Sequence, residues 1–324
     1  MQLVTADWRE ILQVLNQTFE IWSPGLDRQS YYHYVWRQMT HAWSRKNFRF
    51  LVYRDGQTVV ASCKLYEIEL AGRGVTHRFA GIGAVFTQHA FRGQGHARRM
   101  LLEIIDGCRR QGYAGLLLFS DIGASYYEEL GFVDLGCNEF FMYMPDAADK
   151  DAKTPDVVAL LELEPQVTPV QLEDIPRLAR HYNRWLRRQP FGFARSQHYW
   201  SFKLRREIFL NIHSQWSWPR MELVELNEPE PGYALIEYSA RTLRALEIIG
   251  PPETRRKLWQ SLLCLALARG ARRIRAWEGL HPDFLKRPNL ADRQWGCPMI
   301  LPLATEIEAW TTFRPCPILE LDHL

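Results

Sequence analysis

A glycine-rich loop between a strand-like run and an amphipathic helix constrains the fold of this chain more than any other feature. Residues 81–87 are mostly apolar, and the sequence Arg-Gly-Gln-Gly-His-Ala follows at residues 92–97. Glycine permits the backbone angles and the close approach that a tight turn requires. Successive backbone N–H groups in such a turn form a concave anion site, and the helix adds the positive end of its dipole. The segment is therefore suited to bind a pyrophosphate.

Helix and strand signals continue after the loop. Apolar side chains recur at the spacing of one buried helix face: Ala97, Met100, Leu101, Ile104, Ile105 and Cys108. A continuous apolar run at residues 114–119 has the length of a strand buried on both faces. Residues 124–130 then read as a short helix that Gly131 closes. The expected order is strand, glycine loop, helix, buried strand and short helix.

This order and its motifs resemble the GNAT superfamily of N-acetyltransferases over about residues 1–145. The loop fits the superfamily's acetyl-CoA pattern, Arg/Gln-x-x-Gly-x-Gly/Ala, and a Tyr-x-x-x-Gly-Phe sequence begins at Tyr127. The resemblance implies an α/β (α+β) fold, with a mixed, mostly antiparallel GNAT-type sheet flanked by helices, and acetyl-CoA as the cosubstrate. Gln88 and His89 stand where a proline often precedes the loop in the family, which reduces the rigidity of the turn but removes no phosphate donor.

The resemblance also assigns roles to individual residues. In the family the strand pairs with the pantetheine arm and the loop binds the pyrophosphate, so the implied cofactor-binding residues are Val85, Phe86, Thr87, Arg92, Gly93, Gln94, Gly95, His96 and Ala97. Tyr127 occupies the position of a tyrosine that protonates the leaving thiolate, and a phenol beside a departing sulfur is able to donate that proton. The alternative for Tyr127 is a core tyrosine without a catalytic role.

Two glycines lie inside the strand that precedes the loop, Gly81 and Gly83. Glycine within a strand indicates a bulge or the close approach of another part of the chain. A bulge here is expected to splay this strand from the strand at residues 116–119. The superfamily threads its cofactor through that gap.

The attacking amine needs a proton acceptor, because most alkyl amines are protonated at neutral pH. A backbone N–H near Val85 is expected to stabilise the developing oxyanion. The candidates for the base are Glu69 and Glu67, on one face of the preceding strand, and Asp121 after the buried strand. The alternatives are solvated carboxylates for the glutamates and, for Asp121, a cap whose side chain accepts from backbone N–H groups.

Composition limits the classes of function. A formal net charge of +3 over 324 residues is too small to argue for nucleic acid as the main partner. Six scattered cysteines form no Cys-x-x-Cys pair and no zinc-like spacing with histidine, so we expect free thiols and no metal. The N-terminal residues lack an export signal, and no apolar run is long enough to span a membrane. These features favour a cytoplasmic protein without a membrane partner.

The second half of the chain predicts a domain with the outline of the first. Polar, proline-bounded residues 148–156 are the expected linker between an N-terminal GNAT domain at 1–147 and a C-terminal domain at 157–324. Hairpin, helix and strand signals recur at residues 233–249, 252–268 and 273–277. Pro251 and Pro252 replace the glycine loop and supply no N–H donors. The second domain is therefore expected to be a degenerate GNAT-like fold without a cofactor loop.

The tandem arrangement, with residues 190–200, is similar to the enhanced-intracellular-survival type of acetyltransferases. Those enzymes carry a third, sterol-carrier-like domain, and the terminal carboxylate of their chain reaches the active site. This sequence ends at Leu324, too early for the third domain. We therefore do not expect that carboxylate to have a counterpart here.

The first functional hypothesis is an acetyl-CoA-dependent N-acetyltransferase that transfers the acetyl group to a primary amine by direct attack. The alternative is an acyl-CoA-binding sensor or scaffold without turnover. A small amine, a free amino acid, an aminoglycoside-like polycation and a protein lysine are all compatible as the acceptor. Aromatic residues at 27–43 are the expected wall of the acceptor site, with core packing as the alternative for each ring. The second domain is expected either to close that site or to mediate self-association as a homodimer.

Overall fold

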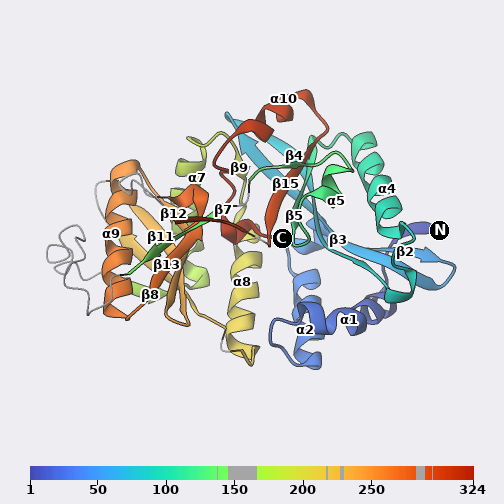
Figure 1. The fold of residues 1–324 in the computed structure, drawn as a ribbon, viewed down its shortest axis with the longest axis horizontal. Helices are drawn as coiled ribbons and strands as arrows, with labels where there is room; N and C mark the ends of the chain where they lie inside the picture. The colour runs from blue at the N-terminus through green and yellow to red at the C-terminus, as the bar shows by residue number, and fades with distance from the viewer. Residues whose placement is uncertain (137, 145–165, 217, 227–229, 282–288, 294) are drawn as a thin grey trace.

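The computed structural model describes residues 1–136, 138–144, 166–216, 218–226, 230–281, 289–293 and 295–324. Two twisted sheets stand side by side, each covered by helices, and helix α8 (Gln197–His213) lies between the two halves (Figure 1). The end of the chain, marked C, lies at the junction of the two halves.

The first sheet, in the described residues, has eight strands in the order β1-β2-β3-β4-β5-β15-β6, with β9 paired to β3. Its strands are β1 (Gln2–Thr5), β2 (Phe48–Asp55), β3 (Thr58–Gly72), β4 (Val75–Thr87), β5 (Gly115–Ser120), β6 (Val133–Asp134), β9 (Gly192–Phe193) and β15 (Cys297–Pro302). The pair β4–β5 is parallel, and its neighbours are antiparallel. The predicted mixed, mostly antiparallel sheet is confirmed.

The helices of the first half are α1 (Trp8–Trp22), α2 (Arg28–Thr40), α3 (Ser44–Asn47), α4 (His96–Arg110) and α5 (Ser125–Glu128). Asp7 caps α1 in a capping box with Glu10, and Asp27 caps α2. Helix α4 covers one face of the first sheet (Figure 1). The side chains it buries follow the predicted face: Met100, Leu101, Ile104, Ile105 and Cys108.

The second sheet has the order β14-β7-β13-β12-β11-β10-β8 among the described residues. Its strands are β7 (Asn138–Tyr143), β8 (Val167–Pro169), β10 (Met221–Leu226), β11 (Gly232–Ser239), β12 (Thr242–Ile249), β13 (Arg273–Trp277) and β14 (Asn289–Asp292). Its remaining helices are α7 (Ile175–Leu186) and α9 (Pro252–Ala268), and α10 (Thr305–Glu308) follows β15. Helix α9 and strand β13 have the predicted bounds. As in the first sheet, a strand (β12) leads through a helix into a parallel partner (β13), which confirms the predicted GNAT-like outline.

The two sheets exchange strands, which the predicted boundary at residue 147 does not anticipate. Strand β7 precedes that boundary but pairs with β13 and β14 of the second sheet. Strand β15 comes from the second half but lies between β5 and β6 of the first sheet. Figure 1 shows β15, coloured red, beside the green β5, and the green β7 beside the orange β13. The predicted linker at 148–156 lies outside the described residues.

Three further observations concern the described residues. No helix among them is long and apolar enough to cross a membrane. No group of three or more His, Cys, Asp or Glu side chains among them is placed to hold a metal ion. Burial raises the pKa of the Cys63 thiol to about 12 and that of Cys108 to about 11, so both thiols are protonated at neutral pH.

Candidate functional site

Strand β4 leads through the glycine loop into α4, and the backbone is exposed at this junction. Gly93 and Gly95 have φ angles of 75° and 74°, in the left-handed region that glycine adopts without strain. A Cβ atom added at either position would meet no atom within 4 Å, so the space in front of the loop is open. Gly95 is the N-cap of α4, and no side chain caps the helix. The first N–H groups of α4 are therefore available to an anion.

Side chains of the loop brace it from behind. Arg92 donates to the carbonyl oxygen of Thr87 at 3.2 Å, and Arg99 donates to the carbonyl oxygen of Gln94 at 2.9 Å. His96 is buried, and its Nδ1 lies 3.0 Å from Arg99. Because a guanidinium has no acceptor, Nδ1 accepts, and Nε2 donates to the side-chain oxygen of Gln94 at 3.2 Å. These contacts fix the loop while leaving its backbone N–H groups facing open space.

Strand β4 carries the predicted bulge and the predicted splay. Ala84 has a φ of 49°, and the pairing of β3 with β4 shifts register between Ser62 and Lys64. The parallel pairing of β4 with β5 ends at Ile82 and Leu118, although both strands continue. The stretch of β4 that holds the predicted Val85, Phe86 and Thr87 therefore has an edge without a strand partner on the β5 side. Such an edge is able to pair with an extended ligand.

Tyr127 lies on α5, where the first core surrounds it. Its ring packs edge to face against Tyr126, with centroids 5.0 Å apart, and Phe132, at 6.0 Å. Burial, and to a smaller extent Tyr126 and Asp121, raises the pKa of the Tyr127 phenol above its ordinary value. The phenol therefore keeps its proton at neutral pH. A protonated phenol is compatible both with a proton donor and with a core tyrosine that has no catalytic role.

The structure does not bring the predicted carboxylate bases to the site. Glu69 is exposed. It lies five positions along β3 from Lys64, which pairs with Gly83, and five strand residues span about 16 Å. Glu67 accepts two hydrogen bonds from Arg78, at 2.9 and 2.7 Å, and one from Tyr113, which lower its pKa. Asp121 accepts from the backbone N–H of Gly296 at 2.8 Å. Asp121 therefore accepts from a backbone N–H, as in the predicted cap. This N–H, however, belongs to a distant segment and not to the helix that follows Asp121.

The last residue of the sequence reaches this site, contrary to the expectation from its length. A Cβ atom at Gly81 would collide with Cδ1 of Leu324, and a Cβ at Gly83 would lie 3.8 Å from the carbonyl group of Leu324. The same Cβ at Gly83 would lie 3.3 Å from the Tyr66 ring. The two glycines of β4 therefore make room for the C-terminal segment. The glycine signal was visible in the sequence, but the identity of the approaching segment was not.

Buried charged groups hold the C-terminal segment in place. Arg195 is fully buried and donates to Asp322 at 2.8 and 2.7 Å and to Glu247 on β12 at 2.8 Å. Burial alone lowers the pKa of Arg195, but Asp322 and Glu247 raise it well above the ordinary value. One residue further, the ammonium of Lys203 on α8 donates to the carbonyl oxygen of His323 at 2.5 Å. The second half thus positions the segment that lies on β4.

The second sheet repeats the splay but not the open loop. Pairing of β12 with β13 ends at Ala245, and β12 continues to Ile249. The buried Glu247 lies on this stretch and binds Arg195 and, at 2.7 Å, the hydroxyl of Tyr233. Helix α9 begins at Pro252 with Pro251 as its N-cap, so donors are missing where α4 has them. The junction of β12 and α9 therefore offers fewer backbone N–H donors than the junction of β4 and α4.

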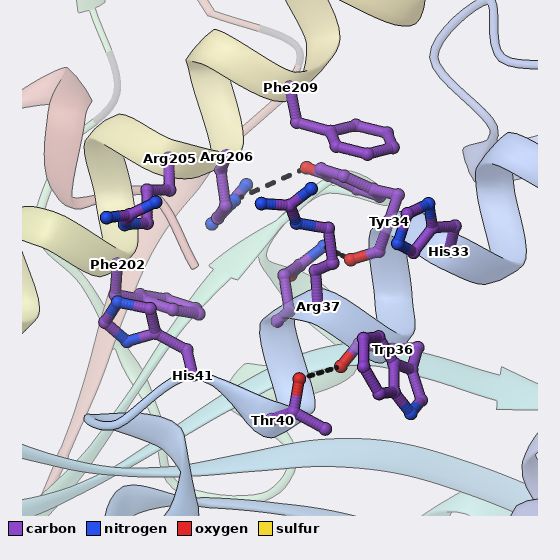
Figure 2. A pocket seen from close by; sticks show the side chains of 11 residues that line it. His33, Tyr34, Trp36, Arg37, Thr40, His41, Phe202, Arg205, Arg206 and Phe209 are labelled. Carbon is purple, nitrogen blue, oxygen red and sulfur yellow. Dashed lines mark hydrogen bonds between the residues drawn. The ribbon is translucent and has the colours of Figure 1, made fainter.

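A cavity of about 320 Å³ lies between α2 and α8, at the predicted aromatic segment. Figure 2 shows its lining, in which side chains of α2 face side chains of α8. The lining residues are His33, Tyr34, Trp36, Arg37, Gln38, Thr40, His41, Phe202, Arg205, Arg206 and Phe209. Two other rings of the predicted wall, Tyr31 and Trp43, are buried in the core. For these two rings the alternative of core packing is the correct one. No motif in the sequence indicates the part of this cavity that α8 supplies.

Comparison with known proteins agrees with this geometry. Residues 2–133 match the family model described as an acetyltransferase (GNAT) domain. No curated protein sequence matches the chain significantly. A GCN5-related N-acetyltransferase from Kribbella flavida has a similar structure, with a TM-score of 0.62 at 16% identity over 93% of this chain and 72% of that chain.

Two further solved structures share the fold across both halves. Eis1 from Mycobacterium abscessus has a TM-score of 0.56 at 14% identity, covering 96% of this chain and 75% of that chain. N-myristoyltransferase of Saccharomyces cerevisiae with bound myristoyl-CoA has a TM-score of 0.51 at 12% identity, covering 93% and 82%. These likenesses span nearly the whole chain and therefore include both sheets.

Proposed function

Because residues 2–133 match the acetyltransferase (GNAT) domain family, we propose that the protein is an acetyl-CoA-dependent N-acetyltransferase. The observation that carries the proposal is the junction of β4 and α4, where an uncapped helix begins beside an unpaired strand edge. A helix N-terminus of this kind binds phosphate groups, and the strand edge binds an extended arm that carries amides. The structural likeness to an enzyme with bound myristoyl-CoA supports an acyl-CoA ligand.

The cofactor roles follow from this junction. The backbone N–H groups of residues 93–97 would bind the pyrophosphate, and Val85, Phe86 and Thr87 would pair with the pantetheine arm. In the transfer, the neutral amine nitrogen bonds to the acyl carbon and gives up one proton to solvent. The carbon–sulfur bond breaks, and the sulfur takes a proton from a donor that solvent then reprotonates. Tyr127 is the proposed donor of that proton, which its raised pKa keeps available at neutral pH.

None of the three predicted side-chain carboxylates is free at the site, but the surroundings of the site favour a neutral amine. Burial and the charge of Arg206 lower the pKa of Lys64, the partner of Gly83, to about 8. Burial and the same arginine lower the pKa of Lys203 well below its ordinary value. An acceptor ammonium placed among these groups would be subject to the same effects. It would therefore lose its proton more readily than in water, as direct attack requires.

One observation favours a second candidate, an acyl-CoA-binding sensor or scaffold without turnover. Glu67 and Asp121 are held by other groups, and Glu69 is remote from Gly83. If the positive surroundings do not deprotonate the acceptor, the site would bind the cofactor without using it.

Calorimetric titration of acetyl-CoA into the wild type, Gly95→Glu and Gly74→Glu tests the proposal. Gly74 is the matched control, because it also has a positive φ, of 82°, and open space around it, but lies in the β3–β4 turn. We expect one site per chain in the wild type and in Gly74→Glu, and none in Gly95→Glu, whose new carboxylate repels the phosphates. Release of free CoA with a panel of amines then separates the enzyme from the sensor. No acetyl-CoA binding by the wild type would refute both.

A further inference from the structure

The cavity between α2 and α8 has a strongly positive lining. Arg37 extends from α2, and Arg205 and Arg206 extend from α8. Figure 2 shows Arg37 and Arg206 reaching toward one another across the space between the two helices. Among the described residues that line the cavity, none is an aspartate or a glutamate. Guanidinium groups that face one another repel unless an anion lies between them.

These three arginines have no carboxylate partner within 4.0 Å among the described residues. Arg37 stacks over the Phe209 ring at 5.7 Å, Arg205 donates to the Ser201 hydroxyl at 3.2 Å, and Arg206 donates to the Tyr34 hydroxyl at 3.4 Å. The adjacent Glu207 accepts instead from the indole N–H of Trp218 at 3.3 Å.

Two other arginines of this chain, one buried and one half-buried, are neutralised by carboxylates. Arg195 binds Asp322 at 2.7 Å, and Arg244 binds Glu237 at 3.1 Å. The contrast sets the cavity apart from the structural ion pairs. The guanidinium groups of the cavity have further N–H donors beyond these contacts. The cavity that they face has a size suited to a small ligand.

The cavity adjoins the proposed transfer site. Phe202 on its wall packs against Trp43 at 4.8 Å, and Trp43 stacks on Tyr66 at 6.4 Å. The Tyr66 ring in turn lies 3.3 Å from the position of a Cβ at Gly83. These three rings are themselves buried, so an acceptor with one end in the cavity would instead approach β4 past Arg206, whose charge acts on Lys64, the partner of Gly83.

We propose that this cavity binds an oxyanion on the acceptor, so that the acceptor is an amine that also carries a carboxylate or a phosphate group. The inference rests on the proposed function and names its substrate class. Guanidinium groups bind both oxyanions through paired N–H donors. The aromatic rings of Trp36 and Phe209 offer apolar faces for the part of the molecule between its charged ends. A polycation, which the sequence left open as an acceptor, is repelled.

A panel of acceptors tests the proposal, with free CoA measured as the product. It contains amino acids and their amides, phosphoethanolamine and ethanolamine, and the polycation spermidine. We expect kcat/KM to fall roughly 10-fold to 100-fold when the anion of a good acceptor is removed, mainly through KM. The amino acid and phosphate arms distinguish the two oxyanions. Equal rates for neutral members, or spermidine as the best acceptor, would overturn the proposal.

Arginine variants connect this preference to the cavity. Arg37→Gln and Arg205→Gln replace exposed side chains, and Arg184→Gln on α7 is the control with the same change of charge outside the cavity. The cavity variants should reduce the preference for the anionic acceptor over its neutral counterpart about 10-fold, with acetyl-CoA affinity unchanged. Equal losses for both acceptors, or an equal effect of Arg184→Gln, would contradict the assignment.

Direct titration of the same panel keeps this test separate from that of the proposed function. If the protein binds acetyl-CoA without turnover, an anionic member that binds the wild type and binds Arg205→Gln about 10-fold more weakly still supports the site. If neither assay finds an anionic member preferred over its neutral counterpart, the proposal is wrong even where the protein acetylates amines.

Discussion

Arg195 donates two hydrogen bonds, of 2.8 and 2.7 Å, to Asp322, which lies 127 residues further along the chain. Arg195 follows β9, which pairs with β3 of the first sheet, whereas its other partner, Glu247, belongs to the second sheet. The two contacts therefore join both sheets and the C-terminal segment at one buried point. The segment that this point holds leads directly to Leu324 on β4.

Asp322→Asn should lower the free energy of unfolding by about 3 kcal/mol, because the neutral amide no longer balances the buried positive charge of Arg195. Urea unfolding of the wild type and the variant measures the difference. Asp106→Asn is the control, since Asp106 pairs with Arg109 on an exposed helix face and should matter by less than about 0.5 kcal/mol. Equal, small losses in the two variants would show that the buried pair contributes no more than a surface pair.

Gly81→Ala should weaken acceptor use more than stability. Its new methyl group meets the flexible end of the Leu324 side chain, which has to move away from β4. We expect kcat/KM for the acceptor to fall several-fold, with acetyl-CoA affinity retained. Leu324→Ala removes the colliding atoms, so the double variant should recover part of the loss. A double variant no better than Gly81→Ala would argue against this contact.

Tyr127→Phe should retain acetyl-CoA affinity and lower kcat about 100-fold at pH 7 if the phenol protonates the leaving sulfur. The loss should shrink above pH 8.5, where a thiolate is able to leave without a proton. Steady-state kinetics at several pH values measure both effects. Tyr126→Phe, which alters the neighbouring ring, is the control. A full rate in Tyr127→Phe would identify this residue as a core tyrosine.

His323 should make the protein less stable in acid. Burial and the charges of Lys203 and Arg206 lower its pKa to about 3, compared with 6.5 for an exposed histidine. Between these values the unfolded chain binds a proton that the folded protein does not. Stability is therefore present above pH 6.5 and is lost as the pH falls toward 3. From pH 7.5 to pH 5 this amounts to at most about 2 kcal/mol, and less because the ring is partly exposed.

Urea unfolding at the two pH values, in the wild type and in His323→Phe, measures this contribution. His198→Phe, at an exposed position of α8, is the control. The His323 variant should lose less stability on acidification than the other two proteins. An unchanged pH dependence in His323→Phe would mean that the ring titrates alike in the folded and unfolded states.

Local signals in the sequence predicted the elements and the loop. Helix α9 starts at Pro252 and α4 ends just before Gly112, because proline and glycine act on the backbone of their own segment. The bulge in β4 was indicated by Gly81 and Gly83, and the uncapped start of α4 by its glycines. Each of these features depends on residues that are close together in the chain.

Features that depend on distant residues were not predictable in the same way. Asp121 reads as a helix cap, but the N–H that it binds belongs to Gly296. Nothing in the local sequence connects Arg37 with Arg205, and only the packing of α2 against α8 brings them to one cavity. The continuous apolar run of β15 is compatible with either sheet. Its pairing with β5 is determined by which edge the folded chain leaves open.

The exchange of β7 and β15 means that neither half of this protein is a self-contained folding unit. A fragment that stops at residue 147 would lack β15, so the apolar edge of β5 would stay open and invite association with other chains. The same fragment would carry β7 without the sheet to which it belongs. The chain therefore has to complete its C-terminal part before its N-terminal sheet closes. We therefore expect the N-terminal fragment alone to aggregate and not to form a working domain.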